Sequence, residues 1–140
     1  MPLVPARIDC VGGIVADSTG RLLLVRRGHE PSLGRWSVPG GRVEPGETDP
    51  AAVRREVLEE TALDVLVEDL AGTVERPAPD GSLFVIRDYH CRPAPGADPA
   101  AVRAGDDAAE VGWFTRDQVL ELDCTPGLVE ALTGWGALAP

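Results

Sequence analysis

Three glutamates at helical spacing are the residues of this sequence best suited to chemistry. Glu56, Glu59 and Glu60 lie within the segment 48–63, TDPAAVRREVLEETAL. At about 100° per residue, a helix places them one turn apart on a single face. Like charges at this spacing repel one another and destabilise an isolated helix. A positive partner is therefore expected, either Arg55 or a hard divalent cation such as Mg²⁺, which takes oxygen ligands.

A glycine-rich turn precedes this helix in a fixed register. Gly40 and Gly41 are followed by Glu47 and then by Arg55. Adjacent glycines allow the backbone to come close to a ligand and to adopt conformations closed to other residues. A charge run is ordinarily interpreted as a solvated acidic face. The register of the turn with Glu47, Arg55 and the acidic face favours a functional site instead.

The segment 41–63 resembles the Nudix box. The matching positions are Gly41, Glu47 and the run REVLEETAL that begins at Arg55. The pattern departs at Ala62, where the family has glycine. This position lies at or just after the helix end, so the change is expected to affect packing more than chemistry. So many charged positions at fixed spacing are far more specific than a lone glycine motif. The resemblance implies an α/β fold, a Nudix-type α/β/α sandwich with a mixed central sheet.

The resemblance also implies roles for individual residues. The implied metal ligands are oxygen donors: the Gly40 carbonyl, Glu56, Glu59 and Glu60. Glu56 and Glu59 are also candidates for the general base. Glu47 and Arg55 would hold the acids in place without touching the metal. An ordinary salt bridge between Glu47 and Arg55 would look the same.

A second group of acids follows a proline-rich loop. Residues 93–107 contain three prolines and no periodicity, and loops of this length are usually functional. Many Nudix relatives place a glutamate six residues before a Trp-Phe pair, as a base or a further metal ligand. Here that position is Asp107, with Asp106 and Glu110 beside it. Asp107 and Glu110 are therefore candidate catalytic residues, and solvated loop acids are the alternative.

Two arginines complete the candidate site. Arg26 and Arg27 end the predicted strand RLLLVRR. They are either solvated charges or a phosphate clamp, because guanidinium groups match phosphate oxygens. Arginines, glycine turn and acidic helix together suit cleavage of a pyrophosphate, whose charge repels an attacking water. Mg²⁺, with Mn²⁺ as an alternative, neutralises that charge and lowers the pKa of bound water.

The resemblance implies hydrolysis of the pyrophosphate bond of a nucleoside diphosphate linked to another moiety. The stretch 38–113, with VPGGRVEPGE and AGDDAAEVGWF, looks most like small ADP-ribose pyrophosphatase-type members. ADP-ribose or a similar nucleotide derivative is therefore the first expected substrate. A sanitiser of oxidised nucleoside triphosphates, of the 8-oxo-dGTP type, is the alternative enzyme. A non-catalytic nucleotide-binding Nudix domain is a weaker hypothesis, because such domains generally lose the acids that this chain keeps.

The hydrophobic pattern predicts the elements that must position these residues. Asp17-Ser18-Thr19-Gly20 is turn chemistry, so segments 7–16 and 21–27 are expected to form a hairpin. Thr48 or Asp49 is expected to cap the acidic helix, with Pro50 in its first turn. Further strands are expected at 35–38, 64–75, 83–92 and 111–115, and helices at 48–61, 116–122 and 125–132.

Composition limits the class of protein. A chain of 140 residues is expected to form a single domain, 1–140. A net charge of −10 argues against a nucleic acid polymer as partner and leaves a small nucleotide substrate. No apolar run approaches the roughly 18–20 residues that span a membrane. Cys10, Cys91 and Cys124 are unclustered, so buried reduced thiols and a cytoplasmic location are expected. Whether the chain forms a homodimer is left open.

Overall fold

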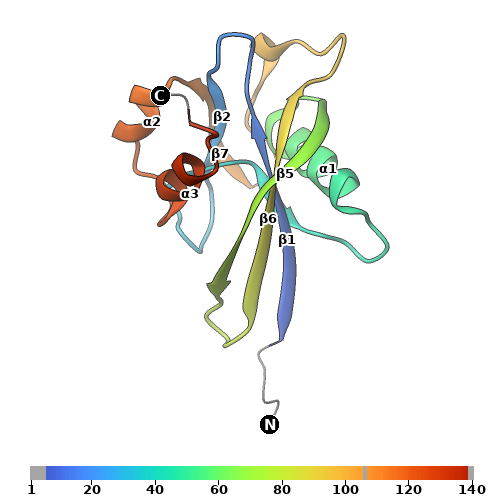
Figure 1. The fold of residues 1–140 in the computed structure, drawn as a ribbon, viewed down its shortest axis with the longest axis vertical. Helices are drawn as coiled ribbons and strands as arrows, with labels where there is room; N and C mark the ends of the chain where they lie inside the picture. Colours follow the sequence, from blue (N-terminus) through green and yellow to red (C-terminus); the bar gives the residue numbers. More distant parts are fainter. Residues whose placement is uncertain (1–5, 106, 139–140) are drawn as a thin grey trace.

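Two sheets form the centre of the molecule (Figure 1). The computed structural model describes residues 6–105 and 107–138, so Asp106 lies outside the described residues. The larger sheet has the order β4 (Gly40–Arg42), β1 (Arg7–Val15), β6 (Leu83–Pro93) and β5 (Val65–Pro77). The smaller sheet has the order β3 (Trp36–Ser37), β2 (Leu22–Arg27) and β7 (Ala108–Phe114). Strands β1 and β6 pair in parallel, whereas β1–β4 and β5–β6 pair antiparallel, so the larger sheet is mixed.

Helices flank these sheets on both sides. They are α1 (Asp49–Thr61), α2 (Arg116–Glu121) and α3 (Leu128–Gly134), with a short 3₁₀ helix, η1 (Pro99–Ala101), in the loop after β6. Figure 1 shows α1 on one side of the long strands and α2 and α3 on the other. The predicted fold class, an α/β/α sandwich with a mixed sheet, is confirmed.

The predicted hairpin of segments 7–16 and 21–27 is wrong in its pairing. Asp17 does turn the chain, because its carboxylate accepts hydrogen bonds from the backbone N–H groups of Thr19 and Arg21. A single bridge between Ala16 and Leu22 then joins two strands that belong to different sheets. The turn residues set the reversal but not the partner. The four apolar residues 22–25 are all buried, which suits a strand between two neighbours, β3 and β7.

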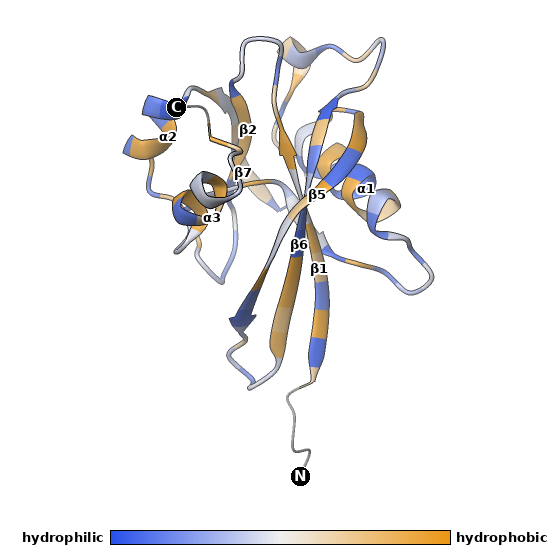
Figure 2. Ribbon diagram, in the orientation of Figure 1, coloured by the Kyte–Doolittle hydropathy of each residue, from blue (hydrophilic) through white to orange (hydrophobic). Residues whose placement is uncertain are grey.

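The acidic helix begins and ends where local signals predict. The Thr48 hydroxyl accepts a hydrogen bond from Ala51 N at 3.3 Å, and proline stands in the first turn. Val53 and Val57 are fully buried against the core that β1 lines. Figure 2 shows hydrophobic and hydrophilic residues alternating along α1, so its polar face is left for the acids. The helix ends at Ala62, which has a φ of 64° in the left-handed region.

Other boundaries differ by a few residues from the predicted ones. Strand β7 begins at Ala108 instead of residue 111, and α3 runs to Gly134. All three cysteines are free, but Cys91 alone is buried, while Cys10 and Cys124 are partly exposed. Within the described ranges, no helix combines the length and apolar character needed to cross a membrane.

Candidate active site

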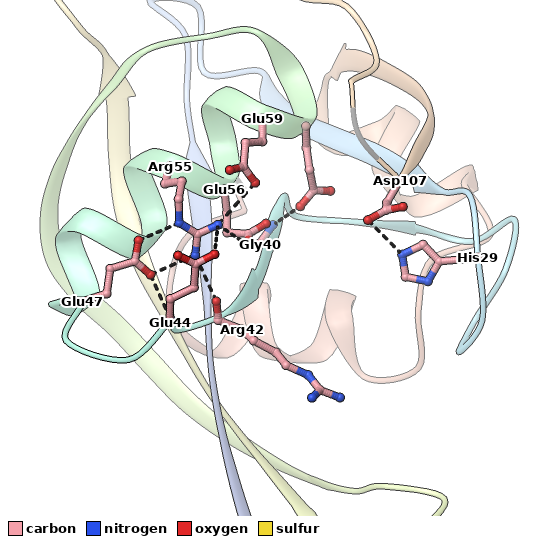
Figure 3. Close-up of polar contacts among 10 residues, drawn as sticks. His29, Gly40, Arg42, Glu44, Glu47, Arg55, Glu56, Glu59 and Asp107 are labelled. Atoms are coloured by element: carbon pink, nitrogen blue, oxygen red, sulfur yellow. Dashed lines mark hydrogen bonds and ion pairs between the residues drawn. The ribbon is translucent and has the colours of Figure 1, made fainter.

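Arg55 on α1 lies at the centre of a cluster of carboxylates (Figure 3). Its guanidinium group donates to both oxygens of Glu47, Nε to Oε2 at 2.6 Å and Nη2 to Oε1 at 2.9 Å. Nη1 donates to Glu56 at 2.8 Å and to Glu59 at 3.3 Å. The Arg42 carbonyl accepts from Nη2 at 3.1 Å. One arginine thus joins the loop before α1 to two acids on the helix face.

The cluster is electrostatically uneven. Hydrogen bonding to Arg55 lowers the pKa of Glu47 to about 2, so this carboxylate stays ionised as the anchor of the arginine. Burial raises the pKa of Glu56, although Arg55 opposes that shift. Burial raises the pKa of Glu60 further, to about 8, and the nearby charges of Glu56 and Asp107 add to the effect. Negative charge is therefore compensated at Glu47 and much less so at Glu60.

The glycine turn touches the same helix face. Gly40 N–H donates to Glu60 Oε1 at 3.0 Å. A Cβ atom at Gly41 would lie 2.6–2.7 Å from the Glu56 carboxylate, which is closer than any side chain tolerates. Glycine at position 41 is therefore required for Glu56 to approach the turn. Backbone and carboxylates meet here as the sequence pattern predicts, and the ligand role of the Gly40 carbonyl stays a prediction.

The loop after β6 is attached to the end of α1 by its backbone. Arg103 N–H donates to the Thr61 carbonyl at 3.0 Å, and Gly105 N–H donates to the Glu60 carbonyl at 2.9 Å. Asp107 follows in a left-handed conformation, with a φ of 61°. Its carboxylate lies 3.9 Å from His29 Nε2 (Figure 3). Its charge also raises the pKa of Glu60, so Asp107 lies within electrostatic range of α1.

The two candidate arginines point to different partners. Arg26 pairs with Glu110 across the β2–β7 ladder, with Nη2 2.7 Å from Oε1. Arg27 donates from Nε to the Pro31 carbonyl at 2.6 Å, and its charge lowers the pKa of Glu60. Arg27 is therefore the arginine whose charge reaches the acidic helix, while Arg26 and Glu110 neutralise each other. A phosphate role for either arginine stays a prediction.

The predicted metal ligands are close to one another without forming a preset site. Among residues 6–105 and 107–138, no three side chains of His, Cys, Asp or Glu converge as metal ligands would. The Arg55 guanidinium instead bonds to both Glu56 and Glu59. The donor set still fits Mg²⁺ chemically, because carboxylate and carbonyl oxygens are its preferred ligands and the partly buried Glu60 has no cationic hydrogen-bond partner among the described residues. The ligand set stays a prediction.

Sequence reasoning overlooked Asp88. It lies in the middle of β6 and is only 5% exposed, and no donor among the described residues reaches its Oδ1. Burial alone raises its pKa to about 6. The available signal was an acid inside the predicted strand LFVIRDYHC, which is mostly apolar and aromatic. Sequence could not show that its neighbours on both adjacent strands, Gly12 and Gly72, carry no side chain that could bind it.

Comparison with known proteins identifies the family and the fold. A family model described as "NUDIX domain" matches residues 6–132. An "ADP-ribose pyrophosphatase" of Methanocaldococcus jannaschii is 36% identical over 112 residues, 80% of this chain and 64% of that protein. A "Putative 8-oxo-dGTP diphosphatase 2" of Mycobacterium tuberculosis is 36% identical over 133 residues, 92% of this chain and 84% of that protein. The crystal structure of a MutT protein from Methanosarcina mazei superposes with a TM-score of 0.80 at 25% identity, covering 96% of both chains.

An α/β/α sandwich that presents an acidic helix to a glycine turn is the framework of a small hydrolase acting on acid anhydrides. With the family model matching most of its length, the chain belongs to the Nudix hydrolase family. Its relatives are named as pyrophosphatases and phosphatases of nucleotides, so the class of enzyme is pyrophosphohydrolase and the class of substrate is a small nucleotide.

Proposed function

We propose that the protein hydrolyses the pyrophosphate bond of a nucleotide with Mg²⁺ as its cofactor. The observation that supports this most directly is the approach of the Glu56 and Glu60 carboxylates to the Gly40-Gly41 turn. Glu56, Glu59, Glu60 and the Gly40 carbonyl would hold the metal. When bound, Mg²⁺ neutralises pyrophosphate charge and lowers the pKa of a water molecule.

The other residues of the site orient the carboxylates and the substrate. Arg55, anchored by Glu47, fixes the rotamers of Glu56 and Glu59, so the acids are oriented before substrate arrives. Arg27 adds positive charge on the side of Glu60, where a phosphate oxygen would lie. Glu56, Glu59, Asp107 and Glu110 are the proposed bases. Of the two loop acids, Asp107 is the one whose charge raises the pKa of Glu60 on the helix, whereas Glu110 is paired with Arg26.

Two substrate classes follow from the relatives. ADP-ribose or a similar derivative is the first, supported by the Methanocaldococcus jannaschii protein. Oxidised guanine triphosphates of the 8-oxo-dGTP type are the second, supported by the Mycobacterium tuberculosis protein, which this chain covers more fully. The unpartnered Asp88 carboxylate also favours this second class. We further propose that residues 1–140 act as one catalytic domain in the cytoplasm. A homodimer stays a prediction for sedimentation analysis.

A substrate panel tests the proposed reaction. ADP-ribose, dinucleoside polyphosphates, nucleotide sugars and nucleoside triphosphates are incubated with Mg²⁺, and the released phosphate species are identified. Each productive substrate is expected to give a nucleotide and a phosphorylated second product, and excess EDTA is expected to abolish the reaction. Glu60→Gln is expected to lower kcat by about a hundredfold. Glu121→Gln, an exposed glutamate on α2, is the matched control. Turnover by Glu60→Gln at the rate of the control would refute the assignment.

A further inference from the structure

A row of four residues crosses the whole larger sheet, and three of them are glycine. Gly40 on β4 pairs with Gly12 on β1, Gly12 pairs with Asp88 on β6, and Asp88 pairs with Gly72 on β5. Paired residues on neighbouring strands share a face of the sheet. Asp88 is therefore the single side chain in this row, and its carboxylate has bare backbone on either side.

This row lies on the face of the sheet away from α1. Arg87 and Tyr89, the neighbours of Asp88 on β6, both bond to Asp49 at the start of α1, at 2.6 and 2.7 Å. Alternation along a strand places Asp88 on the opposite face. There α3 covers the sheet, since the Trp135 indole occupies the space that a side chain at Gly72 would need. Figure 1 shows α3 on this side of the long strands.

Asp88 is held in place with no hydrogen-bond partner for Oδ1 among residues 6–105 and 107–138. Its Oδ1 lies over Gly12, where any Cβ atom would collide with it. The residue is 5% exposed and Oδ1 accepts no hydrogen bond from the described residues. Burial is the cause of its raised pKa, and no charge among the described residues offsets that shift. A buried polar atom without a partner is costly and needs an explanation, and a ligand that donates hydrogen bonds supplies one.

The row also leads to the proposed pyrophosphate site. Gly40 lies at one end of the row on the edge strand β4 and donates its N–H to Glu60 on α1, so the row and the acidic helix meet at this edge of the sheet. Asp88 lies two strands away, which is about 10 Å at ordinary strand spacing. A nucleotide extends over a similar length from its phosphates to the far edge of its base. A nucleotide with its phosphates beside Gly40 can therefore place its base edge at Asp88. This step rests on the proposed function.

We propose that Asp88 reads the base of the substrate and selects guanine. An ionised carboxylate offers two acceptor oxygens, and guanine presents two adjacent donors, N1–H and N2–H₂. Adenine presents a single donor, N6–H₂, beside the acceptor N1, so one carboxylate oxygen would face a lone pair. The 8-oxo form of guanine keeps both donors and binds equally at this edge. Base entry requires Trp135 to move off Gly72, and the displaced indole then offers a surface for stacking.

The test compares three nucleotides that differ at this edge: dGTP, dITP, which lacks the N2 amino group, and dATP. Wild-type kcat/KM with Mg²⁺ is expected to fall in the order dGTP, dITP, dATP, with about tenfold or more between the first and the last. Asp88→Asn presents one donor and one acceptor and therefore matches adenine. This variant is expected to prefer dATP over dGTP. Asp69→Asn removes an exposed carboxylate on β5 and is expected to keep the wild-type order.

Equilibrium binding of the same nucleotides, measured by calorimetry in Ca²⁺ instead of Mg²⁺, separates this proposal from the proposed reaction. Binding in the order dGTP, dITP, dATP in Ca²⁺, with no hydrolysis of any of the three in the Mg²⁺ assay, would refute hydrolysis of these nucleotides and support base reading by Asp88. Hydrolysis with equal kcat/KM for all three nucleotides would overturn the role of Asp88 and leave the reaction standing. An unchanged order in Asp88→Asn would also overturn it. The wild-type comparison of dGTP with dITP needs no variant, so it decides the matter even if Asp88→Asn fails to fold.

Discussion

Replacing Asp88 with asparagine is expected to stabilise the folded protein, and more so at alkaline pH. Burial raises the pKa of this carboxyl from 3.8 to about 6. The folded state therefore holds the proton more tightly than the unfolded state does. The contribution of Asp88 to the free energy of unfolding is therefore most favourable below pH 3.8. It falls as the pH rises through 6, because the folded state must then bury an ionised carboxylate. A shift of about two pKa units corresponds to about 3 kcal/mol.

The penalty depends on pH in a way that asparagine does not share. At pH 8 the full loss of about 3 kcal/mol applies, and at pH 5 about half of it applies. Asparagine has nearly the same shape and no charge. Asp88→Asn is therefore expected to raise the free energy of unfolding by about 3 kcal/mol at pH 8 and by about 1.5 kcal/mol at pH 5. For a chain of this length, the former corresponds to a rise in Tm of about 10 °C.

Urea unfolding of wild type and Asp88→Asn at pH 5 and pH 8 measures this difference. Subtracting the two proteins at each pH cancels the titration of all other groups. Asp69→Asn, which removes the same charge from an exposed position, is expected to change the free energy of unfolding by less than about 0.5 kcal/mol. An Asp88→Asn difference that is zero at pH 8, or equal at both pH values, would refute the burial of an unpartnered carboxylate.

Three further predictions concern the acidic helix and its surroundings. Ala62→Gly is expected to raise the free energy of unfolding in urea by about 0.5–1 kcal/mol, because the left-handed φ of 64° strains alanine; no gain would contradict that conformation. Mg²⁺ at a hundred times its Kd is expected to stabilise the fold by about 2.7 kcal/mol, and an unmoved Tm would count against a metal site. Asp107→Asn is expected to lower kcat while leaving the Mg²⁺ dependence of the rate unchanged, whereas Glu56→Gln is expected to damage both. If Asp107→Asn and Glu110→Gln both turn over substrate at the wild-type rate, the base lies on α1.

Sequence predicted α1 well because its signals are local. The Thr48 cap, the proline of the first turn and the helical spacing of Val53 and Val57 all act within a few residues of one another. The contact between Glu47 and Arg55 was also foreseen, since family resemblance and charge both pointed to it. These features need no knowledge of how distant segments pack.

Strand pairing was harder to predict because its partners are distant in sequence. Nothing local distinguishes a hairpin from two strands that separate into different sheets after one bridge, as β1 and β2 do. The separation of Arg26 from Arg27 has the same origin. Neighbouring residues on a strand point to opposite faces, so Arg26 meets Glu110 on β7 while Arg27 acts toward the helix. A pair of adjacent arginines in sequence is therefore not a pair in space.

The register of β1 positions both the residue proposed to lie near the phosphates, Gly40, and the residue proposed to contact the base, Asp88. Gly12 pairs with Gly40 on one side and with Asp88 on the other. A shift of β1 that placed Val11 opposite Asp88 would turn the valine side chain toward the carboxylate and would change the strand pairing of Gly40 at the same time. The phosphate end and the base end are thus set by the same backbone ladder and not by separate loops. Substitution of Gly12 is therefore expected to disturb both base preference and turnover, because any side chain at this position would collide with the Asp88 carboxylate.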